Sequence, residues 1–118
     1  NYYLKNLEPF SSLVTPVGNS PYSISSYHLF PILINFDLLS ITRAKFMNKL
    51  AKKNIFTQVH YIPLNKFRCW ETSDIICTGS LEYYNRVLSL PIYPSLKEDD
   101  IDYICKEIGE ILENASKN

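Results

Sequence analysis

The chain has 118 residues, of which 46% are hydrophobic and 20% are charged. A chain of this length forms one domain and buries roughly two-thirds of its unfolded surface, so it can build a substantial core. Its 12 basic and 12 acidic residues cancel, which argues against a nucleic acid or an anionic lipid surface as the partner.

The three cysteines, Cys69, Cys77 and Cys105, are odd in number and lack the paired close spacing of a zinc site. This pattern favours free thiols in a reducing compartment, although two of them could pair. The longest apolar stretch, residues 29–34, contains Pro31 and is far shorter than a membrane span. We therefore expect a cytoplasmic protein without a membrane partner.

The chain begins with Asn1 rather than Met, so we expect a piece of a longer protein or a trimmed chain. The opening segment agrees with this, because its apolar side chains have the spacing of the last turns of a helix. These side chains are Tyr2, Tyr3, Leu4 and Leu7.

Residues 8–26 are rich in proline and serine, as in a linker, with a possible short strand at residues 13–17. We therefore expect two parts. Residues 1–25 form the end of an interdomain helix and a linker, and residues 26–118 form a small domain.

Residues 26–35 are mostly apolar and rich in β-forming side chains, which predicts a strand with Pro31 at an edge or bulge. A helix follows, with Ser40 as its N-cap and Asn54 at the left-handed position after its end. Apolar side chains recur on one face of this helix, and basic side chains face water on the other. The apolar set is Ile41, Ala44, Met47, Leu50 and Ala51, and the basic set is Arg43, Lys45, Lys49 and Lys52.

The alternation of side chains over residues 55–61 predicts a second strand. Residues 63–79 have no sustained period and predict a long loop with at most a short helical turn. A helix at residues 80–87 and a strand at residues 88–90, ended by Pro91, complete this region.

The last predicted element is a helix that runs to the end of the chain. Ser95 and Glu98 have the spacing of a capping box, and a regular apolar stripe follows them. The order of elements predicts an α/β fold of two layers, in which a small, mostly antiparallel sheet carries about three helices on one face.

Most familiar catalytic signatures are absent from the sequence. Gly18, Gly79 and Gly109 are isolated, so no glycine-rich phosphate loop is present. His28 and His60 lie on separate predicted strands without a nearby ligand partner, so we expect no metal site.

Neither a cysteine–histidine pair nor the acidic residues of the last helix indicate catalysis. A nucleophilic pair of Cys69 or Cys77 with His60 would lack any flanking signature. The acidic residues at the start of the last helix favour the helix dipole rather than catalysis. They are Asp99, Asp100 and Asp102.

Residues 58–65 form the polar end of a predicted strand and the start of an irregular loop, where ligand contacts are common. The alternative is a hydrogen-bonded strand histidine at His60 and a core tyrosine at Tyr61. Aromatic residues farther along the chain are more typical of a core or an interface than of a stacking platform. They are Trp70, Tyr83 and Tyr84.

Three stretches resemble the C-terminal part of the DegT/DnrJ/StrS aminotransferases. They are SYHLFPI at residues 26–32, VHYIPL at residues 59–64 and LSLPIYP at residues 88–94. Their order and spacing also match, and the similarity covers nearly the entire chain. The resemblance is closest to enzymes that aminate UDP-linked 4-keto-6-deoxy-N-acetylhexosamines, as in pseudaminic-acid synthesis and spore-coat polysaccharide biosynthesis.

The resemblance implies the small C-terminal domain of the aspartate-aminotransferase architecture, PLP fold type I. It also implies a homodimer, PLP as cofactor, glutamate as amino donor and a nucleotide-sugar substrate. The lysine and the acidic residue that PLP chemistry requires lie in the large domain of that family. No lysine of this chain stands in the family's Ser-Gly-x-Lys context. We therefore expect this chain alone to bind no PLP and to be inactive.

By motif position, the resemblance implies that His60 and Tyr61 contact substrate, with His28 behind them. The family often has histidine where this sequence has Asn65, which makes Asn65 a fourth candidate with an altered contact. The alternative to an enzyme part is a stand-alone module for assembly or interaction that kept the small-domain fold.

Overall fold

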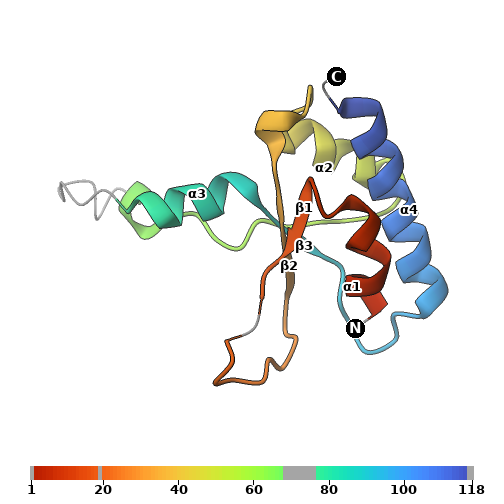
Figure 1. Ribbon diagram of the computed structural model, residues 1–118, viewed down its shortest axis with the longest axis horizontal. Coiled ribbons are helices and arrows are strands. Elements are labelled where there is room, and N and C mark those ends of the chain that lie inside the picture. The colour runs from red at the N-terminus through yellow and green to blue at the C-terminus, as the bar shows by residue number, and fades with distance from the viewer. Residues whose placement is uncertain (1, 19, 68–76, 117–118) are drawn as a thin grey trace.

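The computed structural model describes residues 2–18, 20–67 and 77–116. Within these residues, three strands form an antiparallel sheet in the order β1-β2-β3 (Figure 1). The strands are β1 (Val14–Pro16), β2 (Phe30–Ile34) and β3 (Val87–Leu90); the α-helices are α1 (Tyr2–Leu7), α2 (Arg43–Ala51), α3 (Thr78–Arg86) and α4 (Glu98–Ala115); and the short 3-10 turns are η1 (Glu8–Phe10), η2 (Phe36–Leu38) and η3 (Leu64–Lys66). The predicted α/β class with a small antiparallel sheet is confirmed.

The core lies between the sheet and α4. This helix packs against α1 and α2, and Figure 1 shows α1 and α4 side by side, with α3 extending away on the other side of the sheet. The predicted apolar stripe of α4 is buried, and it supplies Ile104, Cys105, Ile108, Ile111 and Leu112. Burying an aliphatic side chain of this size is worth about 1.5–3 kcal/mol, so this interface contributes much of the stability.

Tyr3 connects α1 to the sheet through a ring contact and a hydrogen bond. Its ring stacks on Phe30 of β2 with the ring centroids 4.7 Å apart. Its hydroxyl donates a hydrogen bond to the carbonyl of Pro91 at 2.9 Å, and burial raises the pKa of the phenol. The helix predicted at the start of the chain is therefore present as α1, and it packs into the core.

Pro31 is the second residue of β2, the central strand of the sheet, so the expectation of an edge or a bulge is wrong. Pro31 is paired with Ser89, whose backbone N–H and C=O point away from β2 and bond to Gln58. The Pro31–Ser89 pair is therefore of the type without mutual hydrogen bonds, and the missing N–H of Pro31 faces β1. There it falls opposite Val17, one residue beyond the end of β1.

The expected helix caps are corrected at α2 and α4. Thr42 caps α2, with its side chain accepting from the N–H of Lys45, while Ser40 hydrogen-bonds to the carbonyl of Ala115. At α4 the N–H of Lys97 donates to the carboxylate of Asp100, so the predicted box of Ser95 and Glu98 does not form. In both cases the capping side chain lies closer to the observed first residue of the helix than the expected one does. Thr42 directly precedes α2, and Asp100 lies in the first turn of α4.

The buried face of α2 also differs from the expected one. Phe46 and Leu50 are its buried residues, whereas Ala44 is exposed. Asn54 has a φ of 60°, so its predicted left-handed conformation after the helix is confirmed.

Residues 55–61 do not form the predicted strand, because they pair with β3 at a single bridge between Gln58 and Ser89. The next positions whose backbone groups would face residues 55–61 are Val87 and Pro91, the residue just after β3. Neither of them can continue the ladder. The N–H of Val87 bonds to Tyr83 and its carbonyl accepts from Arg43, while Pro91 has no N–H.

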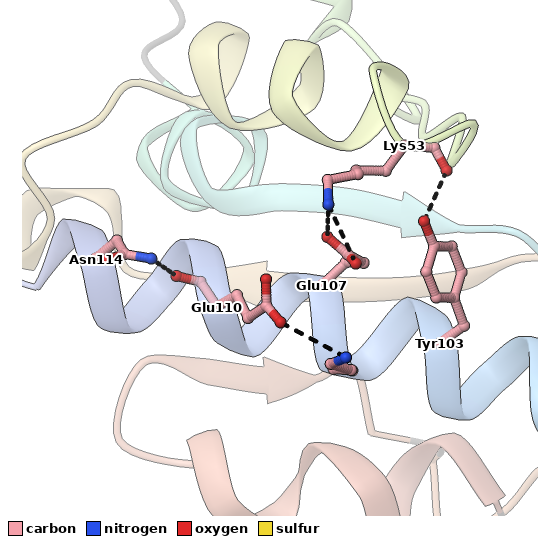
Figure 2. Close-up of polar contacts among 6 residues, drawn as sticks. Lys53, Tyr103, Glu107, Glu110 and Asn114 are labelled. Atoms are coloured by element: carbon pink, nitrogen blue, oxygen red, sulfur yellow. Dashed lines mark hydrogen bonds and ion pairs between the residues drawn. The ribbon is translucent and has the colours of Figure 1, made fainter.

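Lys53, just after α2, contacts α4 at two points, which Figure 2 shows. Its Nζ lies 3.2 Å from Oε2 of Glu107, and its carbonyl accepts a hydrogen bond from the hydroxyl of Tyr103 at 3.3 Å. The Glu107 side chain is 7% exposed, so Lys53 supplies the positive charge that a buried carboxylate needs. Two contacts one helical turn apart fix the end of α2 on α4.

A substitution of Gly109 in α4 tests the tight packing of this helix. A Cβ at this position would overlap the ring of Phe10 and lie 2.9 Å from its Cε1. Gly109→Ala gains about 1 kcal/mol of helix propensity but incurs about 1–3 kcal/mol of overpacking, so we expect a net loss of roughly 1 kcal/mol in urea unfolding. In the Phe10→Ala background the same change should stabilise, and an equal effect in both backgrounds would contradict this packing.

The Lys53–Glu107 pair predicts a pH-dependent stability. The hydrogen bond and charge of Glu107 raise the pKa of Lys53 above its ordinary 10.5. The stabilisation is therefore fully present below pH 10.5 and disappears as the pH rises through the higher pKa of the folded state. We expect Lys53→Met to be less stable than the wild type at pH 7, with a difference that shrinks above pH 10.5.

Lys106 provides the matched control, because it forms an exposed pair with Glu110, both of them in α4. Exposed pairs of this spacing are worth about 0.3–0.5 kcal/mol, so Lys106→Met should change little. Denaturant unfolding at several pH values measures both variants. A difference for Lys53→Met that stays constant above pH 10.5 would contradict the pairing.

Candidate functional site

His60 is held by the edge of the sheet. Because Gln58 is the single bridge to β3, the chain leaves the sheet immediately after it, and His60 lies beside Ser89. Nδ1 of His60 is 2.9 Å from Oγ of Ser89, and Ser89 is only 4% exposed. One ring nitrogen of His60 is thus occupied by the protein, and Nε2 is the other.

Tyr61 is an exposed residue of this site and not the core tyrosine of the alternative interpretation. Its side chain is 68% exposed, and its ring lies edge-on to the ring of His60 with the centroids 4.8 Å apart. Tyr61 also lines an open pocket of about 400 Å³ between residues 61–64 and the start of α3. Tyr83 and Ser80 belong to the α3 side of this pocket.

Asn65 lies in η3, directly after the residues that line this pocket. Its side-chain oxygen, Oδ1, is buried and has no hydrogen-bond partner among the described residues. A buried carbonyl oxygen without a donor is unusual in a folded protein.

His28 lies in a different place. It is exposed in the connection between β1 and β2, where it lines a pocket of about 520 Å³ together with Tyr27, Phe30 and Pro31. The structure therefore brings His60 and Tyr61 together and places His28 in a separate hollow.

Ser89 is a site residue that the sequence reasoning missed. It is the one polar residue of β3, in which all four residues are buried. A buried polar side chain in an apolar strand requires a hydrogen-bond partner, and this requirement is the signal that could have found it.

Arg43 was also missed, because it was expected to face water. Its Nη1 donates hydrogen bonds to the carbonyls of Tyr84 and Val87, at 3.4 Å for the latter. Its guanidinium lies over the ring of Tyr84, 4.7 Å from the centroid, and Nζ of Lys66 is 5.2 Å from the same centroid. Arg43 thus joins α2 to the end of α3 and to the first residue of β3.

The two cysteines in the described part of the chain differ in burial. Burial raises the pKa of the Cys105 thiol to about 12, which keeps it protonated and unreactive at neutral pH. Cys77 is a half-buried free thiol at the start of α3. Cys69 and Trp70 lie outside the described residues.

Neither a metal centre nor a membrane helix emerges from the residues that the structure describes. They contain no group of three or more metal-ligating side chains. None of their helices is long and apolar enough to cross a membrane.

The described residues do not fit PLP. The cofactor needs a lysine in a shielded site, yet every lysine in residues 2–18, 20–67 and 77–116 is exposed. The pocket beside Tyr61 contains neither a lysine nor an acidic side chain that could face the pyridine nitrogen.

Comparison with known proteins assigns the chain to a family. The model of the DegT/DnrJ/EryC1/StrS aminotransferase family matches residues 1–109. The chain belongs to this family. The expected resemblance is thereby confirmed.

Three curated relatives match nearly the whole chain. An uncharacterized protein of Methanocaldococcus jannaschii is 34% identical over 93% of the chain. The spore coat polysaccharide biosynthesis protein SpsC of Bacillus subtilis is 26% identical over 96% of the chain. The dTDP-4-amino-4,6-dideoxy-D-glucose transaminase of Shigella dysenteriae is 30% identical over 93% of the chain.

Solved structures agree on the fold. Helicobacter pylori PseC, an aminotransferase involved in the biosynthesis of pseudoaminic acid, superposes over 96% of the chain with a TM-score of 0.79 and 22% identity. The chain spans about 30% of the length of the relatives it matches, at 29% of the Methanocaldococcus protein, 30% of SpsC and of the Shigella transaminase, and 31% of PseC. The fold is therefore that of one part of a type I aminotransferase.

The hydrogen bonds of Arg43 to the end of α3 and to β3 predict a measurable effect on stability. The carbonyl of Tyr84 belongs to the last turn of α3, where carbonyls lack a partner within the helix, so Arg43→Met leaves it unpaired. We expect a loss of about 1–3 kcal/mol in urea unfolding and a smaller loss for Arg43→Lys, which keeps one donor group. Lys45→Met on the exposed face of α2 is the control. A loss for Arg43→Met no larger than that of the control would refute this role.

Proposed function

We propose that the chain is the small C-terminal domain of a PLP-dependent aminotransferase that acts on a nucleotide-linked 4-keto-6-deoxy sugar in the cytoplasm, for cell-surface polysaccharide biosynthesis. The observation that carries this proposal is membership of the aminotransferase family over residues 1–109. The names of SpsC and of the Shigella transaminase support the class of substrate. In this proposal residues 26–118 are the small domain and residues 1–25 connect it to the domain before it.

The partner required by this proposal is the large domain that binds PLP, in the same or a separate chain, and the assembled enzyme is a homodimer. When bound there, PLP supplies the electron sink for moving an amino group from glutamate to the sugar. The exposure of all the described lysines supports placing the covalent lysine outside them. On its own this chain is inactive.

The role of this domain in the proposal is to bind and orient the sugar nucleotide. His60 offers its second ring nitrogen, Nε2, and the exposed Tyr61 beside it adds an aromatic face and a hydroxyl. Such groups suit the hydroxyl and phosphate oxygens of a sugar nucleotide. In this proposal Asn65 borders the contact region, directly after the residues that line the pocket, and His28 lines a second contact region.

The test combines residues 1–118 with the large domain of a family member, PLP, glutamate and a nucleotide-linked 4-keto sugar. We expect amino transfer by the complex and none by either part alone. His60→Ala should lower kcat/KM about tenfold, because one hydrogen bond is worth ~0.5–1.5 kcal/mol and 1.4 kcal/mol is a factor of ten. Asn114→Ala, on the exposed face of α4, is the control. Absence of any complex, or full activity of His60→Ala, would refute the corresponding part of the proposal.

The second candidate is a stand-alone module for assembly or interaction. Exposed apolar side chains gather between residues 61 and 67, and they favour contact with another protein surface. They are Tyr61, Ile62, Leu64 and Phe67. Sedimentation of the chain at several concentrations separates the two candidates, since self-association without activity supports the module and a monomer that acquires activity with a large domain supports the enzyme part.

A further inference from the structure

The side chain of Ser89 is fixed in a way that constrains His60. Both backbone hydrogen-bonding groups of Ser89 pair with Gln58, with N–H to O at 2.8 Å and O to N–H at 3.2 Å. The residue lies inside β3 and is 4% exposed, so its Oγ occupies a defined position. This oxygen is 2.9 Å from Nδ1 of His60.

The direction of this hydrogen bond follows from the need of the buried Ser89 hydroxyl for an acceptor of its proton. A serine hydroxyl has one proton to donate, and within the described residues Nδ1 of His60 is the acceptor within reach of Ser89. If Nδ1 carried a proton and donated it, the hydroxyl proton of Ser89 would be buried without an acceptor. A buried donor without a partner is costly, so the arrangement in which Ser89 donates is favoured.

We infer that Ser89 is a positioning residue that donates its hydroxyl proton to Nδ1 of His60 and thereby holds the proton of the neutral imidazole on Nε2. The tautomer of a histidine is set by the hydrogen bond that its other nitrogen makes. The ring of Tyr61, edge-on at 74° to the imidazole, further limits its rotation. His60 then presents a hydrogen-bond donor, not an acceptor, to whatever occupies the site.

This inference deepens the proposed function and rests on it in one respect, namely that the acceptor met by Nε2–H is an oxygen of the sugar nucleotide. A fixed donor selects oxygen acceptors such as a carbonyl, a hydroxyl or a phosphate oxygen, and it disfavours a ligand that presents only donors there. Ser89 touches no ligand in this scheme and acts through His60.

The tautomer of His60 can be measured directly by long-range ¹H–¹⁵N correlation spectra of the 118-residue chain. The chain has two histidines, so the exposed His28 is an internal reference for an imidazole in water. At about pH 8.5, where ordinary imidazoles are neutral, we expect the ratio of Nε2–H to Nδ1–H to be roughly tenfold larger at His60 than at His28.

Ser89→Ala should bring the tautomer ratio of His60 to that of His28, and Ser89→Thr, which keeps the hydroxyl, should restore the bias. Ser95→Ala, at an exposed serine, is the matched control and should leave the ratio unchanged. Dispersed backbone amide signals establish that each variant is folded. A proton on Nδ1 of His60, a ratio equal to that of His28 in the wild type, or no response to Ser89→Ala would overturn the inference.

The spectra test the role of Ser89, and the activity assay tests the substrate contact of His60, so the two claims can be refuted independently. If His60→Ala has full activity in the assembled enzyme while the tautomer is as inferred, then the proposed substrate contact is wrong and the role of Ser89 stands. If His60→Ala loses activity while the tautomer of His60 does not depend on Ser89, the substrate contact stands and the inference about Ser89 is wrong.

Discussion

Burial of the apolar face of α4 is the constraint on which the rest of this small fold depends. The sheet has three short strands in the described part of the chain, and such a sheet has little stability without a cover on one face. α4 provides that cover and also receives α1 and α2. The contacts of Lys53 with Glu107 and Tyr103 then fix where α2 ends, and this sets where the chain returns toward β3.

The free edge of β3 shapes the candidate site. A continuous fourth strand would place residues 55–61 flat against the sheet and pair their backbone along its length. Instead the backbone groups of Val87 are used by Tyr83 and Arg43, and Pro91 has no N–H to give. Only Gln58 pairs, so the following residues turn away from the sheet. His60 stays half-buried against Ser89, and Tyr61 is exposed and lines the pocket at α3.

The three sequence stretches that resemble the aminotransferase family meet at one residue. Ser89, from the third stretch, is paired with Pro31 of the first across β2 and β3. On its other side it is bonded to Gln58, and its hydroxyl contacts His60 of the second stretch. A family signature scattered over the sequence is thus a single contact region in space, which gives a physical reason for these stretches to occur together.

The sequence by itself determined the elements whose side-chain period is strong. The apolar stripe of α4, the strand around Ile32, the strand that contains Ser89 and the left-handed Asn54 are all where local pattern and propensity place them. The sequence also singled out His60 and Tyr61 as a pair, and the structure keeps their rings in contact.

Only the tertiary structure decided how residues 55–61 pair, because this depends on whether distant backbone groups are already occupied. The alternation of their side chains is that of a strand. However, Arg43 already binds the carbonyl of Val87, and Pro91 has no N–H, so a strand at residues 55–61 could not pair beyond Gln58. The same reason explains Arg43, a basic residue on a helix face that meets carbonyls more than forty positions away. Local pattern records which residues can form an element, whereas the partners that satisfy their polar groups come from elsewhere in the chain.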